Sequence, residues 1–329
     1  MAKVYYEEDA SIDALKDKVV AVVGYGSQGR HQSLNMRDSG IEVIIAELEG
    51  TDAWNLAKED GFEVVSADEA TKRGDLIIIV VPDELHEPVY WNFIHDNLKE
   101  GKTIGVSHGY SIMYDLIKPP EGVDIVMIAP KAPGPTVRMT YSDGFGVPSC
   151  VAVEKDFSGN ALKTALAWGN AIGSARVGII ETTIEEEVET DHFGEVAVLC
   201  GGCAELIKAG FETLVEAGYQ PEIAYFECLN ELKLIVDLIY EGGIEYMWDA
   251  VSNTAEYGGR VPGKDIVTPD VKENMKALLK DIQNGEHARN WILEQKAGMP
   301  VLNRLRAVES EHQIEEVGRN LRSMMRKKE

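Results

Sequence analysis

The sequence has no long apolar run, few cysteines and a shortage of positive charge. No apolar stretch in its 329 residues is long enough to span a membrane, and the run Leu76–Val81 has the length of a buried strand. Only 32 Lys and Arg residues stand against 56 Asp and Glu, and the net charge of −24 argues against nucleic acid and anionic membrane surfaces as partners. The N-terminal residues show no signal-peptide pattern, so we expect a cytoplasmic protein.

The 4 cysteines do not indicate a metal site. Cys200 and Cys203 have C-x-x-C spacing, but no second pair accompanies them to complete a zinc site. Both fall within a predicted helix, between apolar residues. We interpret them as small packing residues.

A glycine-rich motif lies near the N-terminus. A Val-rich strand, Lys18–Val23, leads into the motif, a helix is expected over residues 30–39, and a second strand over Glu42–Ala46. In this context G-x-G-x-x-G binds a dinucleotide: the first glycine makes the turn, the second lets the backbone approach the pyrophosphate, and the third lets helix pack on strand. The cofactor-binding residues predicted here are Gly24, Tyr25, Gly26, Ser27, Gln28 and Gly29.

Short strand-like runs then alternate with helical or turn segments up to about residue 181. They are Phe62–Val65, Leu76–Val81, Thr103–Val106, Ile125–Ile128 and Cys150–Val153. This alternation predicts an α/β fold with a doubly wound, mostly parallel sheet of the Rossmann type. From about Thr182 only helical patterns continue, although residues 252–258 read as a polar loop. We predict a dinucleotide-binding domain over residues 1–181 and an all-helical domain over residues 182–329.

Polar residues follow the ends of three of these strands. Pro82 and Asp83 come after the first, His108 after the second, and Lys131 and Gly134 after the third. Ligands of parallel sheets bind beyond the carboxyl ends of the strands, so these residues are expected to reach the cofactor or the substrate. The alternatives are a packed core histidine and a surface lysine.

Two acidic pairs stand at i,i+4 spacing in the helical region. Asp191 and Glu195 form the first, and Glu227 and Glu231 the second. Apolar residues continue the same helix faces, so we expect the carboxylates to point to the packed side of each helix. These apolar residues are Val198, Leu199, Leu234, Ile235 and Leu238. Buried acids need a shared cation, and oxygen ligands favour Mg²⁺. The alternative is solvated acids on an acidic protein.

Together these motifs resemble those of ketol-acid reductoisomerase, in its short class I form with a single helical domain. The resemblance covers nearly the whole chain and rests on residues 24–29, 107–109, 129–134, 181–183, 190–195, 198–202, 226–232 and 252–257. It implies the second enzyme of valine, leucine and isoleucine biosynthesis. It also implies that the all-helical domain is knotted.

The resemblance also implies roles for individual residues. Asp191 and Glu195 would bind two Mg²⁺ ions, with Glu227 and Glu231 supplied by the partner subunit of a homodimer or a larger oligomer. Ser252 would touch the substrate. His108 and Lys131 match positions beside the substrate and nicotinamide, and Lys131 would position a water or protonate the new hydroxyl.

The implied reaction has two stages. In the first, 2-acetolactate or 2-aceto-2-hydroxybutyrate loses its hydroxyl proton while an alkyl group migrates to the neighbouring carbonyl carbon, with Mg²⁺ gripping the substrate oxygens. Either Glu231 or a metal-bound hydroxide would take the proton. In the second, NAD(P)H reduces the rearranged 2-keto acid to the 2,3-dihydroxy acid.

One loop departs from the family pattern. The family carries an Arg and Ser residues after the second strand, where they bind the 2′-phosphate of NADPH, but here Leu48, Thr51 and Ala53 stand at those positions. Glu47 and Asp52 add negative charge, and an acid here bonds the ribose 2′-hydroxyl of NAD. We predict a preference for NADH, or use of both cofactors, with Glu47 or Asp52 as the discriminating residue. The alternative is that Thr51 and backbone amides still bind the phosphate.

Two other functions fit parts of the sequence. A metal-free two-domain dehydrogenase, acting on hydroxyacids or imines, also joins this cofactor domain to a helical domain, but it has no use for the acidic pairs. A non-catalytic dinucleotide sensor or assembly subunit would bind the cofactor without turnover. It would leave Lys131, Glu227 and Glu231 without a purpose.

Overall fold

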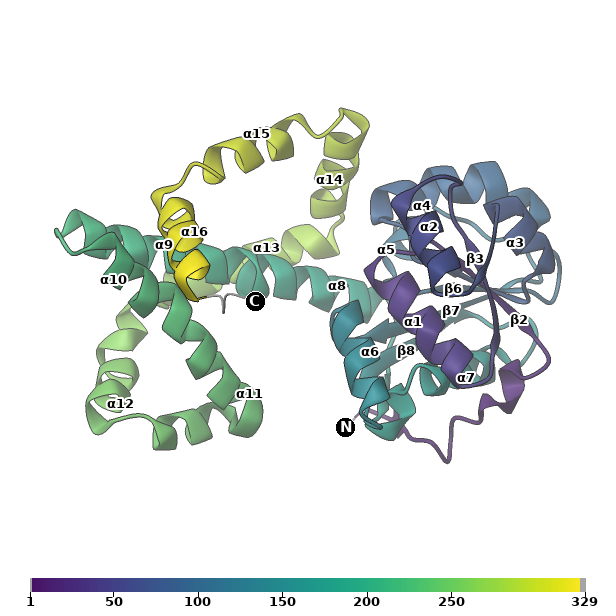
Figure 1. Cartoon of the computed structure of the whole chain (residues 1–329), viewed down its shortest axis with the longest axis horizontal. Coiled ribbons are helices and arrows are strands. Elements are labelled where there is room, and N and C mark those ends of the chain that lie inside the picture. The colour runs from purple at the N-terminus through teal and green to yellow at the C-terminus, as the bar shows by residue number, and fades with distance from the viewer. Residues whose placement is uncertain (1, 326–329) are drawn as a thin grey trace. The chain divides into compact units, whose positions relative to one another are not determined.

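The computed structural model describes residues 2–325, and the chain divides into two compact units (Figure 1). The first ends at Thr190 and the second begins at Asp191. This division falls inside one continuous helix, α8 (Ile184–Gly194), rather than in a loop. Within residues 2–325, no helix is long and apolar enough to cross a membrane.

The first unit is built on one nine-stranded sheet with the order β1-β9-β8-β7-β6-β5-β2-β3-β4. The strands are β1 (Val4–Tyr5), β2 (Val19–Val23), β3 (Glu42–Ala46), β4 (Glu63–Val65), β5 (Leu76–Ile79), β6 (Thr103–Val106), β7 (Asp124–Pro130), β8 (Ser149–Lys155) and β9 (Ile179–Glu181). Antiparallel pairing is limited to β7 with β8 and β1 with β9, and the other pairs are parallel. The predicted Rossmann-type sheet is confirmed.

The strand residues alternate between two apolar cores, one on each face of the sheet. Along β2, Val20 and Val22 pack into one core and Ala21 and Val23 into the other. Burial on both faces is why these strands read as unbroken apolar runs. Because nearly every residue of such a strand is apolar, even a strand of four or five residues can be recognised in the sequence.

Helices cover both faces of this sheet. Those of the first unit are η1 (Ile12–Leu15), α1 (Ser27–Asp38), α2 (Asp52–Glu59), α3 (Ala67–Arg73), α4 (Asp83–Val89), η2 (Tyr90–Ile94), η3 (His95–Asn97), α5 (Tyr110–Met113), α6 (Gly134–Ser142), α7 (Ala161–Ala171), η4 (Ser174–Arg176) and the first part of α8. Helices α1 and α7 pack on one face through Met36 and Trp168, and α3 and η2 on the other through Ala70 and Tyr90.

The second unit is entirely helical in its described residues, as predicted. Its elements are the end of α8, η5 (Glu195–Leu199), α9 (Gly201–Glu216), α10 (Pro221–Tyr225), η6 (Phe226–Asn230), α11 (Glu231–Ala250), α12 (Asn253–Arg260), η7 (Pro262–Asp265), α13 (Pro269–Gln283), α14 (Glu286–Lys296), α15 (Pro300–Glu309) and α16 (Gln313–Met325). The predicted polar loop over residues 252–258 is wrong, because most of it forms α12. Ser252 caps this helix, its hydroxyl accepting the N–H of Ala255 at 3.2 Å.

The second unit buries few apolar residues of its own. Its buried core consists of Phe211, Ala224, Tyr225, Ile314, Val317 and Leu321. Large apolar side chains elsewhere in this unit are exposed, among them Tyr240 at 91% and Leu199 at 69%. Cys200 is also exposed, so its predicted packing role is wrong within the single chain. Apolar surface on this scale is typical of a protein interface.

Candidate active site

The glycine-rich loop joins β2 to α1 at the carboxyl edge of the sheet. Gly24 has φ +104°, and a Cβ there would lie 2.8 Å from the backbone nitrogen of Val81. At Gly29 a Cβ would lie 2.1 Å from the carbonyl oxygen of Gly24, whereas at Gly26 it would meet no atom within 4 Å. Gly24 and Gly29 are therefore required by the fold itself. Gly26 faces open space, as expected for a position that a cofactor approaches closely.

Substituting these glycines separates the two roles. We expect Gly29→Ala to lower the melting temperature by at least about 5 °C, because its Cβ would overlap backbone. Gly26→Ala, in contrast, should leave the melting temperature within about 2 °C of wild type and raise the KM for NADH at least tenfold. Thermal melts and NADH titrations of both variants test this. Equal effects of the two substitutions on both measurements would contradict it.

Not every residue of the loop offers its side chain to a cofactor. The ring of Tyr25 is buried, and its hydroxyl donates to Asp60 at 2.9 Å, so only the backbone of this residue faces the cofactor edge. Ser27 begins α1, whose N-terminal amides can bind phosphate. Gly134 packs directly on this residue, because a Cβ at Gly134 would lie 2.1 Å from the Ser27 carbonyl oxygen.

A partly buried amide network ties the glycine loop to the loops that carry His108 and Lys131. The Gln28 amide donates to the carbonyl of Ala132 at 3.0 Å, in the loop that follows Lys131. The Gln32 amide donates to Gln28 Oε1 and to Ser107 Oγ, both at 3.0 Å, and Ser107 directly precedes His108. These contacts hold three loops at one edge of the sheet. The sequence pattern gave no sign of the Gln32 contacts.

Glu47 lies at the end of β3 with its carboxylate turned towards the glycine loop. It accepts the N–H of Tyr25 at 2.9 Å and the N–H of Leu48 at 3.0 Å. Thr51 is occupied as the cap of α2, since its hydroxyl donates to the carbonyl of Leu48 at 2.8 Å and accepts the N–H of Trp54 at 3.2 Å. The Leu48 side chain is exposed. Of the two acids predicted to discriminate cofactors, Glu47 is the one that bonds the glycine loop.

Asp52, Pro82 and Asp83 were also predicted to bind the cofactor, but none of them bonds the glycine loop in the described residues. Asp52 begins α2 and is exposed. Pro82 and Asp83 begin α4, where the Asp83 carboxylate lies 3.8 Å from Nε2 of His86. His86 is buried, its Nε2 hydrogen-bonds the carbonyl of Val81 at 3.0 Å, and burial lowers its pKa. This histidine therefore fixes the turn that carries Pro82 and Asp83.

A buried carboxylate, Glu187, joins His108 to Lys131. Its Oε2 accepts from Nδ1 of His108 at 3.0 Å and from the N–H of Gly109 at 3.3 Å, and its Oε1 accepts from Nζ of Lys131 at 2.9 Å. Glu187 is 3% exposed, whereas the side chain of Lys131 is 38% exposed. The structure therefore brings together His108 and Lys131 as the sequence analysis expected. It does so through an acid that the sequence analysis missed.

The electrostatics of Glu187 favour its ionised form. Burial raises the pKa of this carboxyl, but the hydrogen bond and charge of His108 and the charge of Lys131 outweigh burial and bring the pKa to about 2. The carboxylate in turn orients the His108 ring through Nδ1 and positions Nζ of Lys131. An ammonium group at the carboxyl edge of the sheet can stabilise negative charge that develops on a bound substrate.

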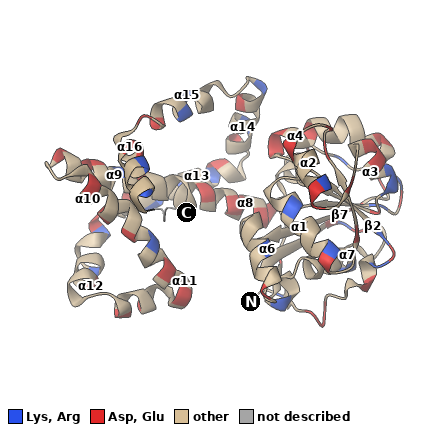
Figure 2. Ribbon diagram, in the orientation of Figure 1, with Lys and Arg blue, Asp and Glu red and all other residues tan. Residues whose placement is uncertain are grey.

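Glu187 lies on the same helix as the first acidic pair. Glu187, Asp191 and Glu195 follow one another at intervals of four residues along α8 and into η5, with Asp191 half-buried and Glu195 exposed. Extending the pair one turn towards the N-terminus would have identified Glu187. The acidic run of α8 is visible as red bands in Figure 2.

Glu227 and Glu231 lie at a second irregular turn. Glu227 is inside the π-helical turn η6 and Glu231 begins α11; Glu195 likewise begins the π-helical turn η5. Such turns occur frequently at functional sites. The expectation that these acids face a packed side is wrong within one chain, because Glu227 and Glu231 are exposed. Their apolar neighbours are exposed too, Val198 at 50% and Leu234 at 57%.

Two family descriptions together match most of the chain. Residues 14–178 match "Acetohydroxy acid isomeroreductase, NADPH-binding domain", and residues 184–327 match "Ketol-acid reductoisomerase, C-terminal domain". The chain is 55% identical over 324 residues to the ketol-acid reductoisomerase (NADP(+)) of Methanocaldococcus jannaschii, covering 98% of each. It is also 55% identical over 325 residues to that of Methanopyrus kandleri, covering 99% of each.

A solved structure agrees with these matches. An NADH-preferring ketol-acid reductoisomerase from an uncultured archean is 48% identical and superposes with a TM-score of 0.96 over 99% of this chain and 100% of the other. The fold and the glycine loop define an NAD(P)-dependent oxidoreductase. The chain belongs to the ketol-acid reductoisomerase family, and its enzyme class is that of an oxidoreductase with an isomerase step. The predicted family, fold class and enzyme class are confirmed.

Proposed function

We propose that this enzyme converts 2-acetolactate or 2-aceto-2-hydroxybutyrate to the 2,3-dihydroxy-3-alkyl acid, by Mg²⁺-dependent alkyl migration followed by reduction with NADH. The observation that carries the proposal is the buried Glu187 held between His108 and Lys131. That arrangement places a fixed cation and an oriented imidazole at the carboxyl edge of the sheet. Parallel sheets bind their ligands at this edge.

The product identifies the reaction. Migration moves the methyl group of 2-acetolactate to the neighbouring carbon, so reduction gives 2,3-dihydroxy-3-methylbutanoate with two methyl groups on one carbon. Reduction of the ketone without migration, as a metal-free dehydrogenase would perform it, would instead give 2,3-dihydroxy-2-methylbutanoate. Proton NMR of the product separates these, because the first shows two methyl singlets and the second shows a methyl doublet. A methyl doublet would contradict the proposal.

Lys131 and His108 act on the substrate oxygens in this proposal. Lys131 is half-exposed and cationic, so it can donate a hydrogen bond to the carbonyl oxygen and a proton to the alkoxide that reduction creates. His108 has Nδ1 bonded to Glu187, which fixes the orientation of its ring. We assign the removal of the substrate hydroxyl proton to Glu231, which is exposed at the start of α11.

The acidic residues fit Mg²⁺ by their chemistry. Asp191, Glu195, Glu227 and Glu231 offer only hard carboxylate oxygens, the donors that Mg²⁺ prefers, and three of the four are exposed. We propose that these residues hold two Mg²⁺ ions. When bound, Mg²⁺ supplies polarisation of the substrate oxygens and the nicotinamide supplies hydride.

A second copy of the chain is proposed to complete the site. The second unit leaves Leu199, Leu234 and Tyr240 exposed, on the helices that carry the acids. Pairing with another copy would bury this surface and give the carboxylates a packed environment. Ser252 is exposed at the N-terminus of α12, where a substrate carboxylate would be favoured.

We propose that the enzyme prefers NADH or, as the alternative, that it uses both NADH and NADPH. The Glu47 carboxylate faces the glycine loop, where it would accept a ribose hydroxyl and repel a 2′-phosphate. Thr51 is committed to capping, and no Arg stands in residues 47–53. Two relatives carry NADP(+) in their names and the solved relative is NADH-preferring, so overall likeness does not decide the cofactor.

Removing the charge of Glu47 tests this preference. We expect Glu47→Gln to raise the ratio of kcat/KM for NADPH to that for NADH by at least about tenfold, since repulsion of the 2′-phosphate is lost. Glu49→Gln is a matched control, because Glu49 is exposed in the same loop. An unchanged ratio in the Glu47 variant, or a wild-type enzyme with a clear NADPH preference, would overturn the assignment.

A further inference from the structure

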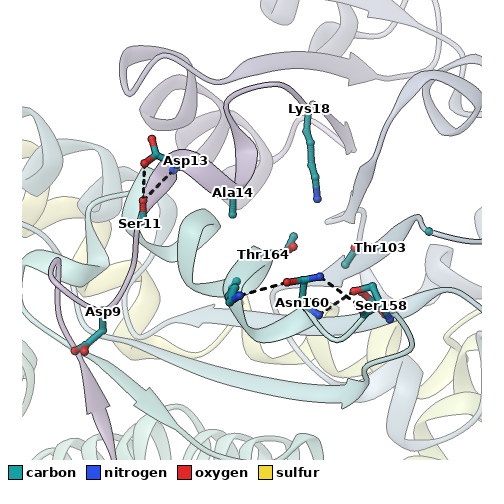
Figure 3. A pocket seen from close by; sticks show the side chains of 12 residues that line it. Asp9, Ser11, Asp13, Ala14, Lys18, Thr103, Ser158, Asn160 and Thr164 are labelled. Atoms are coloured by element: carbon teal, nitrogen blue, oxygen red, sulfur yellow. Dashed lines mark hydrogen bonds between the residues drawn. The ribbon is translucent and has the colours of Figure 1, made fainter.

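The first unit has a polar cavity at the amino ends of its strands, on the edge of the sheet away from the glycine loop (Figure 3). Its volume is about 600 Å³, and it is lined by Lys18 before β2, Thr103 at the start of β6, Asp124 at the start of β7 and the first turn of α7. Strand β6 lies between this cavity and His108, a separation of roughly 10–13 Å. The cavity is therefore distinct from the candidate active site.

Two buried hydroxyl groups line the cavity without a partner. Thr103 and Thr164 are each 3% exposed, and neither side chain hydrogen-bonds any residue among those the structure describes. Figure 3 shows both at the cavity, one from the strand and one from α7. Neither hydroxyl oxygen is among the fully buried, unpartnered side-chain atoms of the described residues, so both are open to the cavity. Both can therefore hydrogen-bond a ligand that enters it.

The cavity is also lined by two lysines, Lys18 and Lys163, beside three aspartates. The Lys18 side chain extends into it, and its ammonium group has no ion pair within residues 2–325 (Figure 3). Helix α7 begins at the cavity floor, and the N–H groups of Leu162 and Lys163 have no acceptor in the described part of the chain. Free N–H groups at the start of an 11-residue helix carry partial positive charge and attract anions.

The carboxylates at the cavity are already engaged. Asp124 accepts the N–H and the hydroxyl of Ser158, at 3.0 and 2.5 Å, and Asp13 forms an ion pair with Lys16. Asp9 accepts a backbone N–H at 3.0 Å. The groups left without partners are an ammonium, two N–H groups and two hydroxyls, all of which can donate, so a ligand that satisfies them supplies acceptor oxygens.

We propose that this cavity binds a small oxyanion, the phosphate or carboxylate group of a hydrophilic metabolite. Lys18, Thr164 and the N-terminus of α7 bind the oxyanion, and Thr103 adds a hydrogen bond. The lining has hydroxyl and amide side chains and no aromatic ring, so it suits a hydroxylated rather than an apolar ligand. The volume is within the range of small-molecule sites.

Binding of inorganic phosphate and of acetate tests the proposal. The full-length protein is saturated with NADH, so that the glycine loop is filled, and no Mg²⁺ is added, so that phosphate has no metal to bridge. We expect one or both anions to raise the melting temperature of the wild type by a few degrees above sodium chloride of equal ionic strength. Calorimetry then gives the Kd, and the anion that binds identifies phosphate or carboxylate as the natural group.

Two separate substitutions locate the effect in the cavity. Lys18→Met and Thr164→Val should each weaken binding at least about tenfold, judged against the melting temperature of the same variant without anion. Lys155→Met removes an exposed lysine from the same unit outside the cavity and should bind like the wild type. Absence of any anion-specific shift in the wild type, or wild-type affinity in both cavity variants, would overturn the proposal.

Discussion

Glu187→Gln is expected to lower kcat with 2-acetolactate by about 10²–10⁴-fold while the protein remains folded. The carboxylate accepts hydrogen bonds from Nδ1 of His108 and from Nζ of Lys131, at 3.0 and 2.9 Å. A neutral amide of the same shape has one acceptor oxygen instead of two, so it cannot accept from both groups, and Lys131 loses its position and His108 its fixed orientation. Steady-state kinetics with saturating cofactor measure the effect.

A matched control and a second substrate sharpen this test. Glu185→Gln changes an exposed acid two residues away on the same helix and should retain activity within about twofold. Supplying the rearranged 2-keto acid bypasses migration and reports reduction alone. We expect Glu187→Gln to slow both stages. Lys131 is proposed to bind the carbonyl oxygen during migration and to protonate the alkoxide that reduction creates. A variant within threefold of wild type on both substrates would remove Glu187 from the mechanism.

The same carboxylate predicts a dependence of stability on pH. Its pKa is lowered from 4.5 to about 2, so the ionised form contributes stability that is fully present above the ordinary carboxyl range and is lost as the pH falls towards about 2. The difference in melting temperature between wild type and Glu187→Gln should therefore shrink as the pH is lowered from 6 to 3. A difference that stays constant over this range would contradict the lowered pKa.

Glu227→Gln is expected to lower kcat by at least about a hundredfold and to raise the Mg²⁺ concentration needed for half-maximal activity at least tenfold. One of the oxygen ligands proposed for the metal is lost, while the glycine loop in the other unit is unchanged. NADH affinity, measured by fluorescence titration, should therefore stay within about twofold. Glu222→Gln is the control, because Glu222 is an exposed acid on the preceding helix, α10.

Mixing two inactive variants tests whether the partner supplies this acid. Asp191→Asn and Glu227→Gln are co-expressed, so that about half of the dimers contain one copy of each variant. If the partner supplies Glu227, one of the two sites in a mixed dimer has every acid intact, and about a quarter of wild-type activity should return. No recovery, with mixed dimers isolated, would place both acidic pairs of one site in the same chain.

The local features of the fold could be predicted from sequence. The strands of the Rossmann-type sheet are apolar because both of their faces are buried, and the three glycines of the loop are spaced for a turn, an approach and a packing contact. Strand β1 could not be predicted, because two residues are too few to show a pattern, and β9 was not predicted either. Helix α12 was missed because Ser252 serves as a cap, and polar caps read like loop residues.

The candidate site was only partly visible in the sequence. His108 and Lys131 each come directly after a strand, and the end of a strand can be recognised from local sequence, so their placement at the carboxyl edge of the sheet could be inferred. Glu187 cannot be told from Glu185 by residue type, and the signal that separates them is spacing, because only Glu187 continues the four-residue interval of Asp191 and Glu195. The apolar residues beside Glu227 and Glu231 predict a helix face packed within the chain, whereas a single chain leaves much of this face exposed.

The most direct test of the proposed two-stage reaction is NADH oxidation, followed by absorbance, with 2-acetolactate in the presence of Mg²⁺ and again after treatment with EDTA. We expect oxidation with Mg²⁺, its loss with EDTA and its return when Mg²⁺ is restored, with NADPH oxidised more slowly than NADH. Oxidation that continues undiminished in EDTA would contradict the two-metal reaction and favour a metal-free dehydrogenase.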